Sequence, residues 1–291
     1  MGGVSRMTVQ LDHPMAPSEP KRVTTIEAGR ANQEYFQDIW RFRELFYILI
    51  WRDILIRYKQ TAIGLAWTLF RPLLSALVFA LVFGKMVNVP SGGNPHAPFI
   101  YVALVPWLFF AATISDVGAS LIAHAGLISK VYFPRLLSPF VATVVALIDM
   151  LIALSLLVPM LWAFGVPITW RLLAIAPLVL LTAALALGLG LCCAALNVKY
   201  RDTGLIIPYV LQFGLYLSPI IFPSDLVPYP WRLLYSLNPM VGLIEGFRWA
   251  AFPNQDLHPT ALAISILSAV LFLILGFRNF RRMERNLADI I

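Results

Sequence analysis

The sequence contains few charged residues and almost no cysteine. Only 13% of its 291 residues are charged, whereas 59% are hydrophobic, and the mean hydropathy is +0.78. Because a soluble domain carries about twice that charged fraction, the soluble globular class is excluded. The two cysteines, Cys192 and Cys193, are adjacent, a spacing that suits neither a metal site nor a disulfide. Both are interpreted as packing residues.

The phosphate-binding motifs of nucleotide-dependent enzymes are also missing. The sequence has no GxxxxGK[ST] loop and no Rossmann glycine fingerprint between a strand and a helix. The chain is therefore expected to lack an ATPase site, and any energy for transport must come from another polypeptide. We expect no metal, no other cofactor and no catalytic residue in this chain, and no nucleic-acid partner.

Long apolar runs make up most of the chain. A helix needs about twenty mainly apolar residues to cross a bilayer. Six runs qualify, so the sequence predicts an all-α, polytopic membrane protein. The predicted spans are about 65–89, 98–123, 138–164, 172–196, 204–223 and 260–277. An even number of spans leaves both termini on the same side of the membrane.

Lysine and arginine are unevenly distributed about these spans. Seventeen of them lie in the N-terminal region, in the loops 124–137 and 197–203 and in the C-terminal tail, against four toward the other side. Positive charge marks the cytoplasmic side of membrane proteins. Both termini are therefore predicted to be cytoplasmic, and the loop 224–259 is predicted to face outward.

The region before the first span divides into two parts. Residues 1–32 are polar, rich in proline and charge, and lack the compact apolar core of a signal peptide, which predicts a disordered cytoplasmic tail. From residue 33 to residue 49, apolar side chains recur at helical spacing opposite polar ones. This pattern predicts an amphipathic helix along the cytoplasmic interface. Trp40 and Trp51 are interpreted as interfacial anchors.

A cationic segment leads into the first span. Arg52, Arg57, Lys59 and Arg71 place four positive charges around the mouth of a membrane helix. Such charge suits an anionic headgroup or a pyrophosphate. Positive charge on a cytoplasmic flank also orients a membrane protein by itself. From charge alone, topology and headgroup binding therefore both remain open.

Short motifs in a fixed order carry a family resemblance that covers about residue 33 to the C-terminus. They are RYKQT-x-x-G-x-x-W-x-x-x-x-P at 57–72, YFPRLLSP at 132–139, NVKYRD at 197–202, YLSPIIFP at 216–223 and LNPM at 237–240. With these motifs, the chain resembles the permease subunits of ABC-2 type exporters, especially those that move O-antigen, teichoic acid or capsular polysaccharides. O-antigen is favoured because the run at 57–72 is closest to that branch.

The resemblance implies a function and a set of partners. The chain is expected to be the permease of an ABC exporter in the bacterial cytoplasmic membrane, surrounded by membrane lipids. It is expected to pair with a second copy of itself and with two ATPase subunits, which bind ATP and Mg. The expected cargo is a polyprenyl-pyrophosphate-linked polysaccharide, whose headgroup enters at Arg52, Arg57, Lys59 and Arg71.

The loop 126–139 has room for a short helix interrupted by Pro134. In the similar exporters, the loop between spans two and three docks on the ATPase subunit. An ordinary basic loop is the alternative, but two aromatic residues between two cations favour docking. The expected contacts to the ATPase are Lys130, Tyr132, Phe133 and Arg135.

The outward loop 224–259 holds apolar runs that are too short to cross the membrane and too apolar to be solvated. Re-entrant helices satisfy both constraints. Asn238 can cap a helix that begins near Pro239. Glu245 and Arg248, three residues apart, are expected to form a local ion pair. The resemblance implies a pair of short gate helices here, with Asn238, Pro239, Glu245 and Arg248 in the outer gate.

Charged and aromatic residues within the spans suggest functional sites. Asp116 and Asp149 lie inside predicted spans, where a functional role, a protonated carboxyl and an inter-helix hydrogen bond are equally good interpretations. Aromatic side chains can line a path for sugar rings, although lipid-facing packing is the commoner role of each one. The predicted pore-lining residues are Trp67, Phe70, Tyr209, Phe213 and Tyr216.

Three rival functions remain at this point. A drug or small-lipid exporter of the same superfamily shares the span count but should lack the run at 57–72. A membrane glycosyltransferase needs a carboxylate or metal cluster in a cytoplasmic loop, and the short inner loops offer only Asp202. A purely structural membrane protein would tolerate loss of the loop 126–139. Teichoic acid and capsule remain the alternative polysaccharide cargoes.

Overall fold

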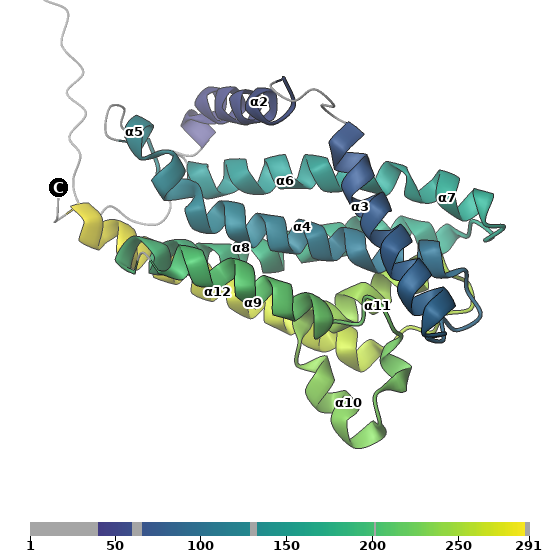
Figure 1. The fold of residues 1–291 in the computed structure, drawn as a ribbon. Helices are drawn as coiled ribbons and strands as arrows, with labels where there is room; N and C mark the ends of the chain where they lie inside the picture. The colour runs from purple at the N-terminus through teal and green to yellow at the C-terminus, as the bar shows by residue number, and fades with distance from the viewer. Residues whose placement is uncertain (1–39, 60–65, 129–132, 201, 289–291) are drawn as a thin grey trace, which may run out of the picture.

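The computed structural model describes residues 40–59, 66–128, 133–200 and 202–288, and these residues form helices without any strand. The tail 1–32 and the first part of the predicted helix 33–49, up to residue 39, lie outside the described residues. The helices, drawn in Figure 1, are α2 (Arg43–Lys59), α3 (Ala66–Phe79), η1 (Ala80–Met86), α4 (His96–Ala123), α5 (Ala125–Ile128), α6 (Leu137–Ser155), α7 (Leu157–Ala163), η2 (Trp170–Ala174), α8 (Ile175–Lys199), α9 (Thr203–Tyr216), η3 (Ser224–Leu226), α10 (Tyr229–Ser236), α11 (Pro239–Ala251) and α12 (Pro259–Ala288).

Within the part of the chain that the structure describes, five helical stretches are long and apolar enough to cross a membrane. They are Ala66–Met86, His96–Ala123, Leu137–Ala163, Trp170–Lys199 and Pro259–Glu284. They agree with five of the six predicted spans, and the chain is a multi-pass membrane protein. The orientation of its termini remains a prediction.

The predicted span 204–223 is shorter in the structure than in the sequence analysis. Its helix, α9, has 14 residues and ends at Tyr216. At 1.5 Å per residue it is about 21 Å long, less than the hydrocarbon core of about 30 Å. Pro219 explains the early end, because a residue that precedes proline is disfavoured in helical conformation and proline has no N–H to donate. Of the six predicted spans, the one at 204–223 is therefore not formed by a helix long enough to cross the membrane.

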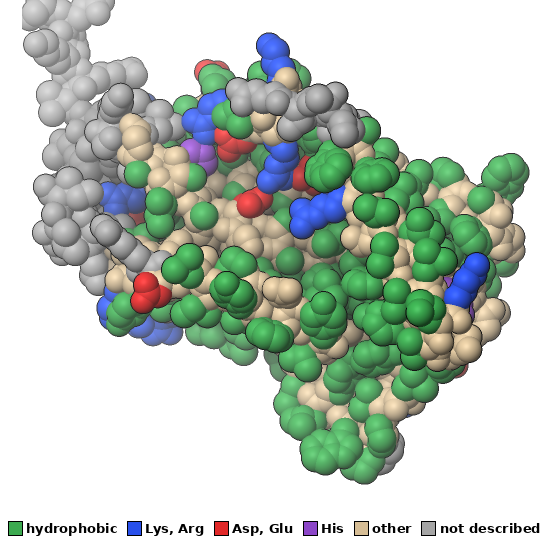
Figure 2. All heavy atoms as spheres, viewed as in Figure 1, with side chains coloured by type: hydrophobic (Ala, Val, Ile, Leu, Met, Phe, Trp, Pro, Cys, Tyr) green, Lys and Arg blue, Asp and Glu red, His purple; other side chains and the backbone are tan. Residues whose placement is uncertain are grey.

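The helix α4 forms the centre of the bundle. It packs against α8, α6, α3, α11 and α9, and most of its residues are buried. Behind it, α8 and α12 approach very closely at Gly188 and Gly276, where a Cβ atom on either residue would collide with the backbone of the other helix. Large apolar side chains on the outside of the bundle remain exposed, as the green surface in Figure 2 shows. This arrangement suits a lipid environment.

The helix α2 lies across one side of the bundle and packs against α6 (Figure 1). It extends the predicted amphipathic helix beyond its expected end at Leu49, so that the cationic segment up to Lys59 is also helical. Leu49 is buried against Val141 and Val145 of α6. Trp40 and Trp51, the predicted interfacial anchors, are exposed.

Two short helices, α10 and α11, connect α9 to α12 (Figure 1). The predicted cap of α11 is confirmed: Asn238 is the N-cap residue, its Oδ1 accepts a hydrogen bond from the backbone N–H of Met240 at 3.0 Å, and Pro239 occupies the first helical turn. The Nδ2 of Asn238 also donates to Ser218 Oγ at 3.0 Å. Asn238 thereby ties α11 to the chain that follows α9. The role of α10 and α11 as a gate remains a prediction.

Candidate functional site

A cavity of about 620 Å³ lies between α2, α3, α4, α6 and α9. Its walls combine apolar and aromatic side chains with a small polar group. The polar and aromatic lining residues are Arg57, Tyr58, Trp67, Thr68, Arg71, Trp107, Phe109, Ser115, Asp116, Asp149 and Gln212. On the face shown in Figure 2, several acidic and basic side chains gather in the upper middle, near α2 and the start of α3, within a mostly green surface.

Four of these residues form the Arg57 cluster: Arg57, Tyr58, Asp116 and Asp149. Arg57 Nη2 on α2 donates to Asp116 Oδ2 on α4 at 2.8 Å, and its Nη1 donates to Asp149 Oδ2 on α6. Tyr58 Oη donates to Asp149 Oδ1. The side chains of Arg57, Asp116 and Asp149 are 36%, 37% and 26% exposed. One guanidinium therefore joins three helices at the wall of the cavity.

The electrostatics of the cluster favour the charged form of Arg57. Burial lowers its pKa, but the charges and hydrogen bonds of Asp149 and Asp116 outweigh that effect, so the pKa is raised overall. Burial, followed by the hydrogen bond to Asp149, raises the pKa of Tyr58. At neutral pH the cluster thus contains an ionised guanidinium and an un-ionised phenol.

The four predicted entrance residues differ in position. Arg57 and Arg71 line the cavity, whereas Arg52 and Lys59 do not. Arg52 pairs with its neighbour Asp53 at 2.8 Å. Among the described residues, no carboxylate forms an ion pair with Arg71, which is exposed. Arg71 is therefore the cation of the cavity that is available to an anionic ligand.

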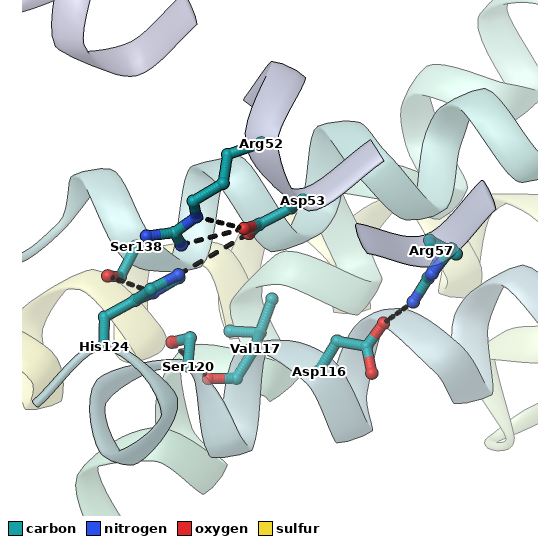
Figure 3. Close-up of polar contacts among 8 residues, drawn as sticks. All are labelled: Arg52, Asp53, Arg57, Asp116, Val117, Ser120, His124 and Ser138. Atoms are coloured by element: carbon teal, nitrogen blue, oxygen red, sulfur yellow. Dashed lines mark hydrogen bonds and ion pairs between the residues drawn. The ribbon is translucent and has the colours of Figure 1, made fainter. Parts of the chain in front are cut away.

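A second polar group lies beside the first, where α2 meets the ends of α4 and α6. Figure 3 shows Arg52 and His124 converging on Asp53, while Ser138 reaches the other side of the imidazole. His124 Nδ1 lies 2.7 Å from Ser138 Oγ, and its Nε2 lies 3.5 Å from Asp53 Oδ2. Burial lowers the pKa of His124 although Asp53 opposes that shift. A neutral imidazole can then accept from Ser138 and donate toward Asp53.

Arg52, Arg57, Asp116 and Asp149 were predicted from the sequence as candidate site residues, but their pairing was not. The signal available was that a carboxylate within a span needs a partner. His124 and Ser138 were missed altogether. Among the described residues, no group of three or more His, Cys, Asp or Glu side chains could hold a metal ion.

Comparison with known proteins identifies the family. Residues 44–252 match the family model described as ABC-2 type transporter. The chain belongs to this family. The match includes every element that lines the cavity of this ABC-2 protein, from α2 to α9.

Curated relatives align with more than four fifths of the ABC-2 chain. The O-antigen export system permease protein RfbA of Myxococcus xanthus is 28% identical over 81% of this chain and 91% of its own length. The protein of the same name from Klebsiella pneumoniae is 24% identical over 85% of this chain and 95% of its own length. The polysialic acid transport protein KpsM of Escherichia coli is 23% identical over 81% of this chain and 92% of its own length.

The predicted pore-lining aromatics lie on two helices of the ABC-2 chain. Trp67 on α3 lines the cavity and stacks on Phe70, with ring centroids 5.8 Å apart. Tyr209, Phe213 and Tyr216 are exposed on α9 and do not line the cavity. The structure therefore brings Trp67 to the polar site and leaves the other four on the outer surface of the chain.

The predicted ATPase contacts lie in and around the segment between α5 and α6. Lys130 and Tyr132 are outside the described residues. Phe133, which was expected to be an exposed apolar contact, is only 3% exposed. Arg135 is half-buried. In this structure Phe133 packs in the interior of the chain. Of the two predicted ATPase contacts that the structure describes, only Arg135 has a side chain that a partner could reach.

The expected ion pair between Glu245 and Arg248 is replaced by other contacts. Arg248 is 1% exposed and donates to the carbonyls of Ile220 at 2.8 Å and Phe222 at 3.2 Å. Glu245 is 7% exposed, and its Oε1 has no hydrogen-bond partner among the described residues. Backbone broken by proline after α9 presents free carbonyls, and the guanidinium binds those instead of the carboxylate.

Proposed function

We propose that this ABC-2 protein is the permease subunit of an exporter that moves a polyprenyl-pyrophosphate-linked polysaccharide, most suitably O-antigen, across the cytoplasmic membrane. A second copy of the chain completes the path, and two separate ATPase subunits supply the energy. The sequence contains no phosphate loop of its own, which supports a division of labour between subunits. The RfbA relatives support O-antigen as the cargo.

The observation that carries the proposal is the cavity beside α2. It places Arg71 and Arg57 next to the aromatic rings of Trp67 and Trp107. Guanidinium groups bind phosphoryl oxygens in a fork-like geometry. Aromatic faces offer sugar rings and isoprenyl chains an apolar surface. A pyrophosphate that joins a lipid to a glycan needs both kinds of contact at one place.

The size of the cavity agrees with a headgroup site. About 620 Å³ lies within the range of sites that hold a small molecule and is too small for a polymer. In our proposal the cavity receives the pyrophosphate and the first sugars. The rest of the glycan passes between two copies of the chain, and the α10–α11 segment releases it.

Deletion of the chain tests the proposal in cells that make a surface polysaccharide. We expect loss of surface glycan, accumulation of lipid-linked glycan inside the cell, and rescue by the intact chain together with its ATPase. Analysis of the accumulated material identifies the cargo. Intact surface glycan after deletion would contradict the proposal and favour a small-molecule exporter.

The KpsM relatives are named as polysialic acid transport proteins, and they support a second candidate cargo, for which we propose a capsular polysaccharide. The same deletion separates the two cargoes. Accumulated glycan with the composition of capsule rather than O-antigen selects this alternative.

A further inference from the structure

We propose that Asp116 and Asp149 are specificity determinants that keep singly charged phospholipid headgroups out of the cavity while a doubly charged pyrophosphate still binds. The inference rests on the proposed function, because it concerns which anionic lipid enters the same cavity. It assigns a role to two carboxylates that face the site and would by themselves repel the proposed ligand.

The charges on the cavity wall cancel. Among the described lining residues, Arg57 and Arg71 are the cations, and Asp116 and Asp149 are the anions. The whole chain, in contrast, has a formal net charge of +7. A site built only to attract phosphate has no use for two carboxylates. Their presence at this wall therefore calls for an explanation beyond attraction.

The guanidinium of Arg57 already has hydrogen-bond partners on the edge that would bind a phosphate. Its two Nη atoms donate to two different carboxylates, one on α4 and one on α6. An anion in the cavity reaches this edge only by displacing Asp116 or Asp149. The three side chains are partly exposed, so the exchange can proceed from the cavity without unfolding of a helix.

The membrane supplies an abundant wrong ligand. The cytoplasmic leaflet is rich in anionic lipids, and basic pockets between membrane helices bind their headgroups. Two unopposed arginines beside α2 would attract such lipids, which far outnumber any lipid-linked glycan. Discrimination then requires a feature that acts against the wrong ligand as well as one that attracts the right one.

Charge number distinguishes the two ligands. A phosphodiester headgroup carries one negative charge, which Arg71 can bind. It has no second negative charge to replace a carboxylate that is displaced from Arg57. A pyrophosphate diester carries a second negative charge that takes the place of the displaced carboxylate. Asp116 and Asp149 therefore penalise the singly charged lipid more than the doubly charged one.

The test compares lipid binding by the full-length chain and four variants, of which one is a double variant. Asp116→Asn and Asp149→Asn keep side-chain volume and one acceptor for Arg57 but remove a charge from the wall. Asp256→Asn is the control, because it removes a charge from an exposed residue that does not line the cavity and that pairs with no arginine among the described residues. Each chain is placed in phosphatidylcholine nanodiscs with increasing phosphatidylglycerol. Native mass spectrometry then measures the phosphatidylglycerol that is retained.

We expect Asp116→Asn and Asp149→Asn to retain phosphatidylglycerol roughly tenfold more strongly than wild type, as removal of an opposing charge from a ligand site predicts. Asp256→Asn should behave as wild type. Adding Arg71→Gln to Asp149→Asn should return phosphatidylglycerol retention to the wild-type level. This result would locate the bound lipid in the cavity. Because it compares several variants, the test does not depend on the folding of any one of them.

A second ligand separates this inference from the proposed function. The probe is a soluble pyrophosphate diester that joins a short isoprenyl chain to a sugar. If wild type binds it but all chains retain phosphatidylglycerol equally, the specificity role is overturned and the headgroup site stands. If wild type binds neither lipid nor probe, the headgroup site and the specificity role are both overturned.

Discussion

Two arginines of the chain are placed in contrasting ways. Arg57 lies at a cavity wall, partly exposed, with each Nη group on a carboxylate. Arg248 is buried and donates to two backbone carbonyls. We call Arg248, Glu245 and Tyr235 the Arg248 cluster; each has a buried polar atom without a hydrogen-bond partner among the described residues.

The two arginines differ in solvent access, and this difference distinguishes a residue that can bind a ligand from one that stabilises the fold. A partly exposed ion pair gains little stability, and its members can exchange partners with a ligand. A buried guanidinium cannot exchange partners without leaving polar groups unpaired, which is costly. We therefore propose that the Arg57 cluster handles the ligand and that the Arg248 cluster holds the connection between α9 and α11.

Replacing Arg248 should produce the largest effect on stability. Arg248→Ala leaves the carbonyls of Ile220 and Phe222 without their donor. It also removes a large buried side chain whose Cζ lies 3.8 Å from the centroid of the Phe99 ring. We expect a loss of about 4 kcal/mol in the free energy of unfolding. Unfolding of the purified chain by SDS in mixed micelles measures it.

The matched control for that change is Arg232→Ala on α10. Arg232 pairs with Asp225, whose side chain is 62% exposed, so its loss should cost less than about 1 kcal/mol. Equal losses of unfolding free energy in the two variants would remove the distinction between a fully buried and a partly exposed arginine.

The Arg248 cluster should also make stability depend on pH. Burial raises the pKa of Glu245 from 4.5 to about 7, although the charge of Arg248 opposes that shift. A pKa raised in the folded state stabilises the fold at low pH, and this contribution is lost as the pH rises from 4.5 through 7. We expect Glu245→Gln to remove a pH-dependent loss of about 3 kcal/mol over this window.

Unfolding measured from pH 4 to pH 8 checks the prediction for Glu245→Gln, and the exposed Asp256→Asn is the control. Wild type and Asp256→Asn should lose stability in parallel as the pH rises, while Glu245→Gln changes less. The interpretation of Glu245 fails if the three curves run parallel throughout.

Arg57 should affect transport more than stability. Arg57→Ala leaves Asp116 and Asp149 at the cavity wall without a cation, so that they repel an anionic headgroup. We expect export to fall roughly thirtyfold or more, as for truncation of one partner of a charge pair at a ligand site. Pulse labelling of surface glycan measures the rate.

Arg57→Lys sharpens this comparison, because an ammonium keeps the charge but cannot donate to two carboxylates in the geometry of a guanidinium. It should export at an intermediate rate. Wild-type export by both variants would show that the Arg57 cluster handles no ligand.

The smallest effect is expected at the junction of α2 with α4 and α6. Ser138→Ala removes the hydrogen bond to His124 Nδ1, which is buried, and should cost about 1 kcal/mol of unfolding free energy. Ser155→Ala, which removes a bond from an exposed hydroxyl to the carbonyl of Ile152, is the control and should cost almost nothing. An equal cost in both variants would argue against a structural role for the His124 contact.

Local signals in the sequence predicted much of the fold. Apolar length predicted five spans, and the Asn238–Pro239 pair predicted the start of α11, because a cap depends on residues next to each other. The run 204–223 was apolar enough for a span, but Pro219 lies within it and α9 ends at Tyr216. Proline content should therefore have outweighed hydropathy there.

The pairing of charges could not be read from the sequence. Arg57 lies 59 residues from Asp116 and 92 residues from Asp149 along the chain. Only the packing of α2 on α6, which itself packs against α4, brings the three together. The expected local pair of Glu245 with Arg248 was wrong for the same reason, since distant carbonyls of Ile220 and Phe222 are the contacts that the guanidinium makes.

Trapping the cargo in the cavity tests the central claim most directly. A photoreactive residue at Gln212, on the cavity side of α9, is compared with one at Leu205, which is exposed on the same helix and does not line the cavity. Illumination of cells that make the glycan should attach lipid-linked glycan to the chain at position 212 and not at position 205. Attachment at position 205 alone, or equally at both positions, would contradict entry through this cavity.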